Sequence, residues 1–463
     1  MIQIDSTLTP ASLATAVADV FAVSAPKIRK LQNRWADKSG TPVFTIAGEY
    51  TARGWTEWTQ GFQFGAAILQ FEFDGNEEFL TIGRQGTLDH MASHLTHIGV
   101  HDHGFNNVST YGNLLRLMAL GKIPHNEWEK NFYELALKTT GAIQAARWTS
   151  LPGNLGYIYS FNGPHSLFSD TVRSLRALAV SHLLGHRLMH EGDKPASLLE
   201  RLLQHAETTA KYNVYYGQGR DFYDISGRTV HESIFNLNDG NYRCPSTQQG
   251  YSPFSTWTRG LSWILLGYAE ELELFDVMSP SEFEPYGGKT KWVDRFLEPA
   301  LATADFFIEH TPTDGIPYWD TGAPNLHKLG DYLNRPAEPD NDHEPVDSSA
   351  AAIAAQGYLR LGKFLEKRGD TKRGHRYFQA GLTIARSLFG GTYLSHDPNH
   401  EGLLLHSIYH QPNGWDYVPP GKKIAQGESS MWGDYHGREL AILIQSLIDG
   451  KTYHRFFNGV ASH

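Results

Sequence analysis

Two aspartates in this chain have surroundings suited to acid–base chemistry. Asp102 lies in His101-Asp102-His103-Gly104-Phe105, and Asp170 lies in Ser169-Asp170-Thr171-Val172. Two carboxylates that converge in an aromatic cleft are the usual equipment for proton transfer at a glycosidic carbon, because one environment can raise the pKa of one of them. Asp102 precedes a predicted helix and Asp170 opens one, so each could instead be an ordinary helix cap.

A second group of residues suits the binding of an acidic sugar. Trp257, Arg259 and Trp263 fall in the first turns of a helix that we expect to begin near Pro253, with Ser252 as its N-cap. Indole rings stack on sugar rings, and a guanidinium meets a carboxylate in a two-pronged geometry. The alternative interpretation is that these side chains only pack the start of a core helix.

Metal chemistry is a weaker interpretation of the same residues. His101, Asp102 and His103 could be metal ligands, but neither a matching downstream ligand cluster nor an HExxH pattern occurs in the sequence. Cys244 is the single cysteine, which excludes intrachain disulfides and thiolate-rich metal sites. These observations make a metal site the less favoured interpretation.

Composition limits the classes of partner. The 463 residues carry a formal net charge of -10, which argues against nucleic acid or an anionic membrane surface as the main partner. The start of the chain lacks a signal-peptide pattern and no apolar run approaches membrane-spanning length, so we expect a soluble, cytoplasmic protein. No linker-like or low-complexity segment interrupts the chain, which predicts a single domain over residues 1–463.

The elements that must position these residues are helices. Helical periodicity recurs from end to end and predicts an all-α class. The predicted helices are 10–36, 57–73, 77–97, 106–122, 126–147, 167–191, 195–215, 253–275, 291–311, 346–368, 371–389 and 428–449. They form six consecutive pairs.

Connection lengths indicate how the pairs are arranged. Long connections rich in aromatic and acidic residues lead into the even-numbered helices, whereas most of the others are short and polar. If the helices alternate in direction, the long connections share one face, which would carry the function. The pattern fits an (α/α)6 barrel of six inner and six outer helices. An α-solenoid ranks lower because no motif repeats at a fixed period.

At these residues the chain resembles the unsaturated glucuronyl hydrolases of glycoside hydrolase family 88, whose fold is an (α/α)6 barrel. The matching motifs are Trp58-Thr59-Gln60-Gly61-Phe62, His101-Asp102-His103-Gly104-Phe105, the helix start at Asp170, His231, Gln249-Gly250-Tyr251-Ser252, Trp257-Thr258-Arg259-Gly260, Asp347-Ser348-Ser349-Ala350 and Gly433-Asp434-Tyr435. The resemblance implies that Asp170 is the general acid and base and that Asp102 is the second essential carboxylate. It also implies that the subsite of the unsaturated uronate is lined by Trp58, His231, Gln249, Trp257, Arg259 and Tyr435.

The reaction that the resemblance implies is hydration of a double bond, which requires neither a metal nor an organic cofactor. The substrate would be an acidic oligosaccharide that ends in a 4,5-unsaturated uronic acid, and Asp170, held protonated by burial, would deliver a proton to C4. Three alternatives stay open: an unsaturated rhamnogalacturonyl hydrolase of the related family 105, a saturated glucuronidase, and a non-catalytic barrel that binds acidic sugars.

Two departures from the family pattern leave the aglycone open. Pro253-Phe254 stands where relatives often have acidic residues, and Asn325 to Pro345 looks like an acidic insertion. The sequence does not decide the parent polysaccharide, the linkage, the tolerance of sulfation or whether the chain forms a homo-oligomer.

Overall fold

A computed structural model describes residues 1–36, 38–54 and 57–460. Helices dominate it, which confirms the predicted all-α class. The α-helices are α1 (Ala14–Trp35), α2 (Gln60–Asp74), α3 (Glu77–His90), α4 (His103–Asn107), α5 (Asn113–Ala119), α6 (Glu127–Ala146), α7 (Thr171–Ser174), α8 (Arg176–Leu183), α9 (Leu198–Asn213), α10 (Thr258–Val277), α11 (Lys289–Glu309), α12 (Ser348–Lys367), α13 (Thr371–Leu388) and α14 (Met431–Ile448).

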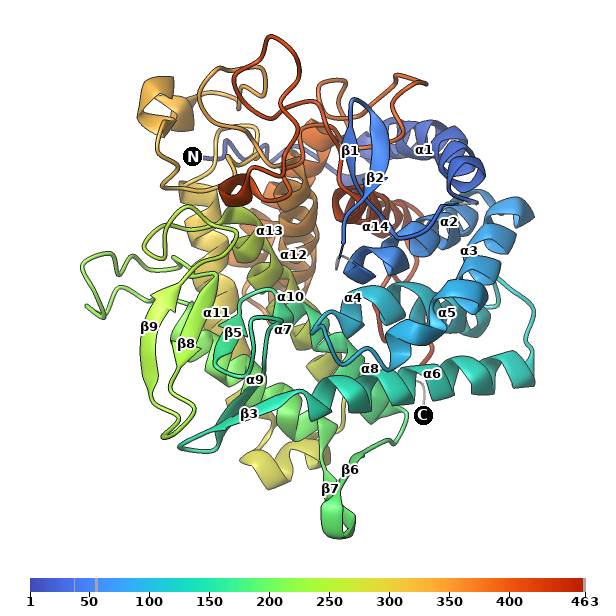
Figure 1. Ribbon diagram of the computed structural model, residues 1–463, viewed down its shortest axis with the longest axis vertical. Helices are drawn as coiled ribbons and strands as arrows, with labels where there is room; N and C mark the ends of the chain where they lie inside the picture. The colour runs from blue at the N-terminus through green and yellow to red at the C-terminus, as the bar shows by residue number, and fades with distance from the viewer. Residues whose placement is uncertain (37, 55–56, 461–463) are drawn as a thin grey trace.

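Six helical segments contact one another in a closed circuit. In order, these segments are α2, α4 with α5, α7 with α8, α10, α12 and α14, and the last packs on the first (Figure 1). Every residue of α10 from Thr258 to Phe275 is buried, as expected for a helix that is surrounded by others. The helices α1, α3, α6, α9, α11 and α13 pack outside this circuit, each against at least one of its members. These six segments correspond to the even-numbered predicted helices, five of which follow a long connection.

Three predicted helices differ from the observed ones. The helix expected from Pro253 begins at Thr258, because the Ser252 hydroxyl accepts a hydrogen bond from the Phe254 amide and closes a local turn instead. The segment 106–122 is divided by a π-helical turn, Val108–Gly112. The segment 167–191 is shorter and is divided into α7 and α8, because Ser166–Phe168 forms a strand that pairs with Glu232–Phe235.

Small antiparallel β-sheets form in the connections between helices. The hairpins are β1 (Pro42–Ile46) with β2 (Glu49–Ala52), β3 (Trp148–Leu151) with β4 (Leu155–Ile158), and β6 (Leu188–His190) with β7 (Lys194–Ala196). The strands β5 (Ser166–Phe168), β8 (Glu232–Phe235) and β9 (Tyr242–Ser246) form an antiparallel sheet. The strands are only three to five residues long, and β5 pairs with the distant β8, so the weak alternation in the sequence did not predict them.

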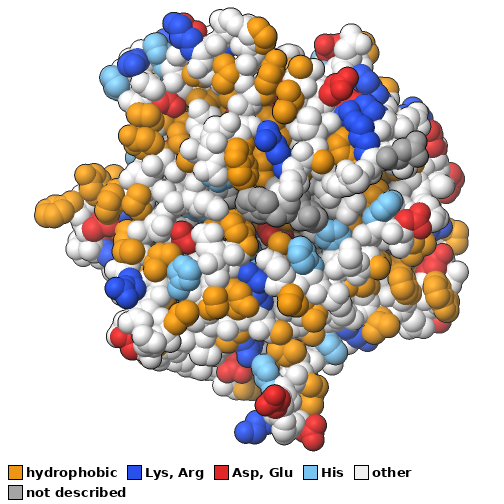
Figure 2. All heavy atoms as spheres, in the orientation of Figure 1, with side chains coloured by type: hydrophobic (Ala, Val, Ile, Leu, Met, Phe, Trp, Pro, Cys, Tyr) orange, Lys and Arg blue, Asp and Glu red, His pale blue; other side chains and the backbone are white. Residues whose placement is uncertain are grey.

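The segment Pro10–Trp35 qualifies by length and composition as a membrane-spanning helix, which corrects the expectation that no such run occurs. Its apolar side chains include Val17, Val20 and Phe21, which are buried, and α1 packs against α14 and α2. Packing inside the molecule covers part of its apolar face. On the face shown in Figure 2, acidic and basic side chains are interspersed rather than gathered by sign.

Glycine permits the close approach of α4 and α7. A Cβ atom on Gly104 would lie 2.2 Å from the Ser174 carbonyl oxygen, a backbone atom that cannot rotate away. The Gly104 amide also donates a hydrogen bond of 2.9 Å to the Ser174 hydroxyl. The two helices that follow Asp102 and Asp170 are therefore held together at this point.

We expect Gly104→Ala to lower the free energy of unfolding by about 1 to 3 kcal/mol, because the added methyl group must push these helices apart. Urea denaturation would measure the change. Gly391→Ala is the matched control, since a Cβ there meets no atom within 4 Å, and it should change stability by less than about 0.5 kcal/mol. Equal effects of the two substitutions would contradict the close-contact argument.

Candidate active site

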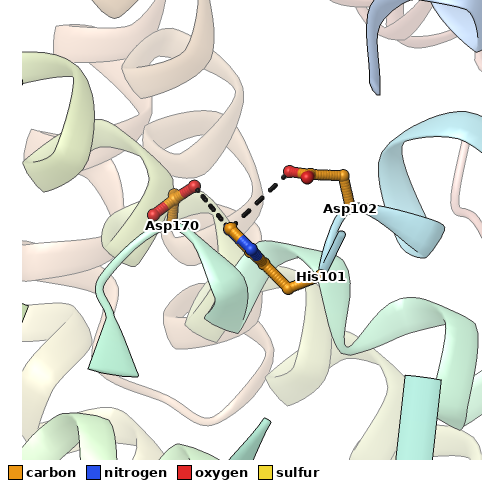
Figure 3. Close-up of side chains that lie close together, drawn as sticks. All are labelled: His101, Asp102 and Asp170. Carbon is orange, nitrogen blue, oxygen red and sulfur yellow. Dashed lines mark hydrogen bonds and ion pairs between the residues drawn. The ribbon is translucent and has the colours of Figure 1, made fainter. Parts of the chain in front are cut away.

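The two aspartates face each other across one imidazole ring. His101 Nε2 lies 3.3 Å from Asp170 Oδ2 and 3.8 Å from Asp102 Oδ1 (Figure 3). Asp102 is the N-cap residue of α4 and Asp170 that of α7, yet neither side chain makes a capping hydrogen bond. The capping interpretation therefore fails for both side chains.

Burial and the imidazole separate the ionisation of the two carboxyls. Burial raises the pKa of Asp102 above its ordinary value of 3.8, although the charge of His101 opposes the shift. Burial acts in the same direction on Asp170, but the hydrogen bond and charge of His101 outweigh it and lower the pKa of Asp170. Burial would lower the pKa of His101, yet the two aspartates raise it. The expectation that burial alone holds Asp170 protonated is thus wrong for the free protein.

His231 stands behind Asp170. Its Nδ1 accepts hydrogen bonds from the backbone amides of Gln248 and Gln249, at 3.0 and 3.3 Å. Burial lowers the pKa of His231 to about 4, so the neutral ring carries its proton on Nε2. That nitrogen lies 3.9 Å from Asp170 Oδ1, and neither atom has another hydrogen-bond partner among the described residues. The gap fits a small movement of Asp170 or a bridging water molecule.

An aromatic pocket encloses this cluster. Its walls are Trp58, Val100, His101, Asp102, Phe105, Phe161, Asp170, Gln248, Gln249, Trp257, Arg259, Trp263, Tyr409 and His410. The free space is about 40 Å³, room for a few water molecules only. A sugar ring can therefore enter only if lining side chains move apart.

Arg259 lines the pocket with its charge already compensated. Nη1 donates to Asp347 Oδ2 at 3.1 Å, and Nη2 donates to Tyr409 O and to Gln249 Oε1, each at 2.8 Å. The guanidinium therefore meets a carboxylate of the protein itself. Because the Gln249 carbonyl is taken by Arg259, its amide NH₂ group is free of that contact and is available to a ligand oxygen.

Tyr435 lies outside the pocket. It is completely buried, and its hydroxyl accepts from Asn113 Nδ2 and donates to Glu439 Oε1, both at 3.1 Å. Its ring packs on Phe62, with the ring centroids 4.9 Å apart. The structure gives Tyr435 core contacts and no place on the pocket wall, because its position on α14 turns it toward the neighbouring helices.

The residues that could hold a metal ion differ from those considered in the sequence. One ligand atom each from His101, Asp102 and Asp170 lies within 4.8 Å of the others, so these buried residues could hold a cation. His103 does not join them, since its Nδ1 contacts Thr140 Oγ1 at 2.7 Å and its Nε2 contacts His97 O at 2.9 Å. In the described cluster the imidazole proton already has a carboxylate partner.

Several pocket residues were not predicted as site residues. Phe161, Tyr409 and His410 come from long connections that the predicted architecture places on the functional face, and this was the only signal that could have found them. His101 was considered only as a metal ligand. Its contact with both aspartates could not be read from its neighbour Asp102 alone.

Fold and pocket together define a helical protein with an acid–base site of the kind used on sugars. No protein-family model matches the chain. It is 25% identical to unsaturated glucuronyl hydrolase from Bacillus sp. (strain GL1) over 450 residues, which cover 95% of this chain and 98% of that protein. It is 23% identical to unsaturated glucuronyl hydrolase from Formosa agariphila, over 85% of this chain and 81% of the relative.

Solved structures are similar over the same extent. The crystal structure of the Bacillus sp. GL1 unsaturated glucuronyl hydrolase matches with a TM-score of 0.68 at 21% identity, covering 92% of this chain and 95% of that one. An unsaturated glucuronyl hydrolase specific for heparin matches with a TM-score of 0.69 at 21% identity, covering 95% and 100%. The comparisons confirm the resemblance to unsaturated glucuronyl hydrolases that the motifs indicated.

We expect His101→Gln to lower the free energy of unfolding by about 1 to 3 kcal/mol where Asp170 is ionised and His101 is protonated. The lowered pKa of Asp170 gives stability that is present above pH 3.8 and is lost as pH falls through the folded-state pKa. The raised pKa of His101 gives stability that is full below pH 6.5 and is lost as pH rises through the folded-state pKa. The effect should therefore be greatest between these two values.

Urea denaturation at pH about 5 and about 9 would measure this difference. His375→Gln, at an exposed position on α13, should show little effect at either pH. A loss for His101→Gln that is the same at both pH values would rule out a charge-dependent contact.

Proposed function

We propose that the protein is a glycosidase that removes a terminal 4,5-unsaturated uronic acid from oligosaccharides by hydrating its C4–C5 double bond. The observation that carries this proposal is the buried Asp102–His101–Asp170 cluster inside an aromatic pocket. The relatives named unsaturated glucuronyl hydrolase support it over most of the chain. The Bacillus enzyme is described as responsible for the degradation of glycosaminoglycan, which supports an acidic oligosaccharide as substrate.

The architecture that we propose is an (α/α)6 barrel of six inner and six outer helices. The closed circuit of contacts among α2, α4, α7, α10, α12 and α14 supports it, as do the outer helices packed on those members. A single domain over residues 1–463 belongs to the same proposal, and it rests on the continuous composition of the chain.

In this mechanism Asp170 is the proton donor. An anionic substrate brings negative charge into the pocket and displaces water from it, and both changes raise the pKa of Asp170 from its low value in the free protein. Asp170 then delivers its proton to C4, which leaves an oxocarbenium-like centre at C5. Asp102 orients the ring and stabilises the developing positive charge.

Water completes the reaction. A water molecule adds to C5 and returns a proton to Asp170, so the carboxyl group is regenerated. The resulting hemiketal opens, and the aglycone leaves with a hydroxyl group. The buried Nε2 of His231, near Asp170 Oδ1, is placed to donate a hydrogen bond to Asp170 or to this water. No step needs direct displacement at C1.

Asp170→Asn should lower kcat by about 10²- to 10⁴-fold, because Asn cannot transfer the proton. Asp102→Asn should also lower kcat, whereas Asp294→Asn, at an exposed position on α11, should leave it unchanged. The measurement is the loss of ultraviolet absorbance of the conjugated alkene in lyase-generated disaccharides. Unchanged thermal unfolding of each variant would show that the fold is retained.

The same assay distinguishes the alternatives. Activity only on rhamnogalacturonan lyase products would favour the family 105 reaction, and release of a saturated aryl glucuronide would favour a glucuronidase. If wild-type protein leaves the alkene absorbance of all lyase products intact yet binds them, the non-catalytic barrel is correct and this proposal fails.

A further inference from the structure

A second pocket opens beside the catalytic one. It has a volume of about 360 Å³, within the range of about 300 to 1,000 Å³ that is usual for ligand sites. Its walls include Tyr251, Trp319, Asp342, Glu344, Gln411 and Lys423. We call it the side pocket.

Backbone continuity joins the side pocket to the catalytic pocket. Gln249 lines the catalytic pocket and Tyr251 the side pocket, and His410 and Gln411 divide in the same way. A third link is Trp257, which forms a β-bridge with Asp320, the residue after Trp319. A ligand that fills the catalytic pocket would therefore have its next unit directed past these residues.

The acidic insertion builds the outer wall of the side pocket. Buried Glu344 accepts hydrogen bonds from Trp319 Nε1 at 2.8 Å and from the Asn325 amide at 2.7 Å, which ties down both ends of residues 325–345. Asp342 pairs with Lys423 at 2.8 Å across the opening. In Figure 1 the insertion lies at the upper left, beside the loops that precede α14. It is therefore part of the cleft.

Resting on the function proposed above, we propose that the side pocket holds the sugar attached to the unsaturated uronate and that it selects an uncharged sugar. The Tyr251 ring is 51% exposed, which leaves a face for stacking on a sugar. At the junction, His410 Nδ1 is buried and has no hydrogen-bond partner among the described residues, so it can meet a ligand hydroxyl.

The charges of the side pocket disfavour a sulfated sugar. Two carboxylates, Asp342 and Glu344, line it against one ammonium group, that of Lys423. Lys423 is already paired with Asp342, and Glu344 is buried with its oxygens engaged. A sulfate group placed here would meet net negative charge and would gain a cation only by separating that pair.

The stacking part of the proposal is tested with two substrates. One is the unsulfated unsaturated chondroitin disaccharide, and the other is the methyl glycoside of the unsaturated uronate, whose aglycone is too small to reach Tyr251. Tyr251→Ala should lower kcat/KM about three- to tenfold on the disaccharide and leave the methyl glycoside unaffected. Tyr223→Ala removes an aromatic ring of similar exposure, 54%, that does not line the pocket, and it should change neither value.

The outcomes separate the two proposals. If wild-type protein hydrates neither substrate, the proposed function fails and this inference fails with it. If wild-type protein hydrates both and Tyr251→Ala affects them equally or not at all, only the side-pocket assignment is overturned. In an Asp170→Asn background, calorimetric binding of the disaccharide should weaken with Tyr251→Ala by the same factor.

The selection of an uncharged sugar by the side pocket is tested separately. Wild-type protein should have a higher kcat/KM on the unsulfated disaccharide than on the same disaccharide with a 6-sulfate group on its second sugar. Asp342→Asn should reduce the ratio of kcat/KM on the unsulfated disaccharide to kcat/KM on the sulfated one, because it removes one negative charge and releases Lys423. A wild-type preference for the sulfated disaccharide that Lys423→Ala abolishes would overturn the selection of an uncharged sugar.

Discussion

The contact of one buried imidazole with two carboxylates is the constraint on which the site depends. Two carboxylates without a cation would be costly in a pocket closed off from water, because each loses hydration and each repels the other. His101 offsets this cost by donating to Asp170 while it lies near Asp102. The position of His101 is set through its own backbone. Its carbonyl oxygen accepts hydrogen bonds from Ser174 Oγ at 2.8 Å and from Gln144 Nε2 at 3.0 Å. Side chains from two helices, α6 and α7, thus hold the backbone that carries the ring.

Buried charges below the pocket fix the mutual rotation of the inner helices. Arg173 on α7 contacts Glu270 on α10 at 2.8 Å and Glu439 on α14 at 3.2 Å. Arg173 lies three residues beyond Asp170, so this pairing also limits where Asp170 can stand. Buried pairs of this kind add little net stability, but breaking one leaves an uncompensated charge, which penalises other arrangements of the same helices.

Arg259 likewise joins two inner helices through a buried ion pair, on the opposite wall of the catalytic pocket. It joins α10 to Asp347, the N-cap residue of α12, and to the loop carbonyl of Tyr409. Because its charge is matched by Asp347, it contributes shape and orientation to the pocket more than an unpaired positive charge. In the proposed function, recognition of an acidic sugar depends on neutral donors whose orientation is fixed, of which Gln249 is the clearest example.

The sequence by itself determined the helical class, the helices that lie inside, and the connections that carry the site. These features follow from local periodicity and from loop length, which each segment records without reference to the others. It also identified Asp102, Asp170, Trp58, Gln249, Trp257 and Arg259, all of which the structure places on one pocket. Residue type and position near a helix start indicated Asp102, Asp170, Trp257 and Arg259, whereas the family resemblance added Trp58 and Gln249.

Tertiary structure alone decided the electrostatics and the neighbours. Asp170 has a lowered pKa because His101 reaches it from a segment 69 residues away, a contact that no local pattern encodes. Tyr435 points into the core because the rotation of α14 is set by its packing against α2 and α12. The insertion at 325–345 became a wall of the cleft through single contacts such as that of Asp342 with Lys423, 81 residues apart. Such contacts join residues that are far apart in the sequence. They form only when the helices pack together, so no local sequence pattern predicts them.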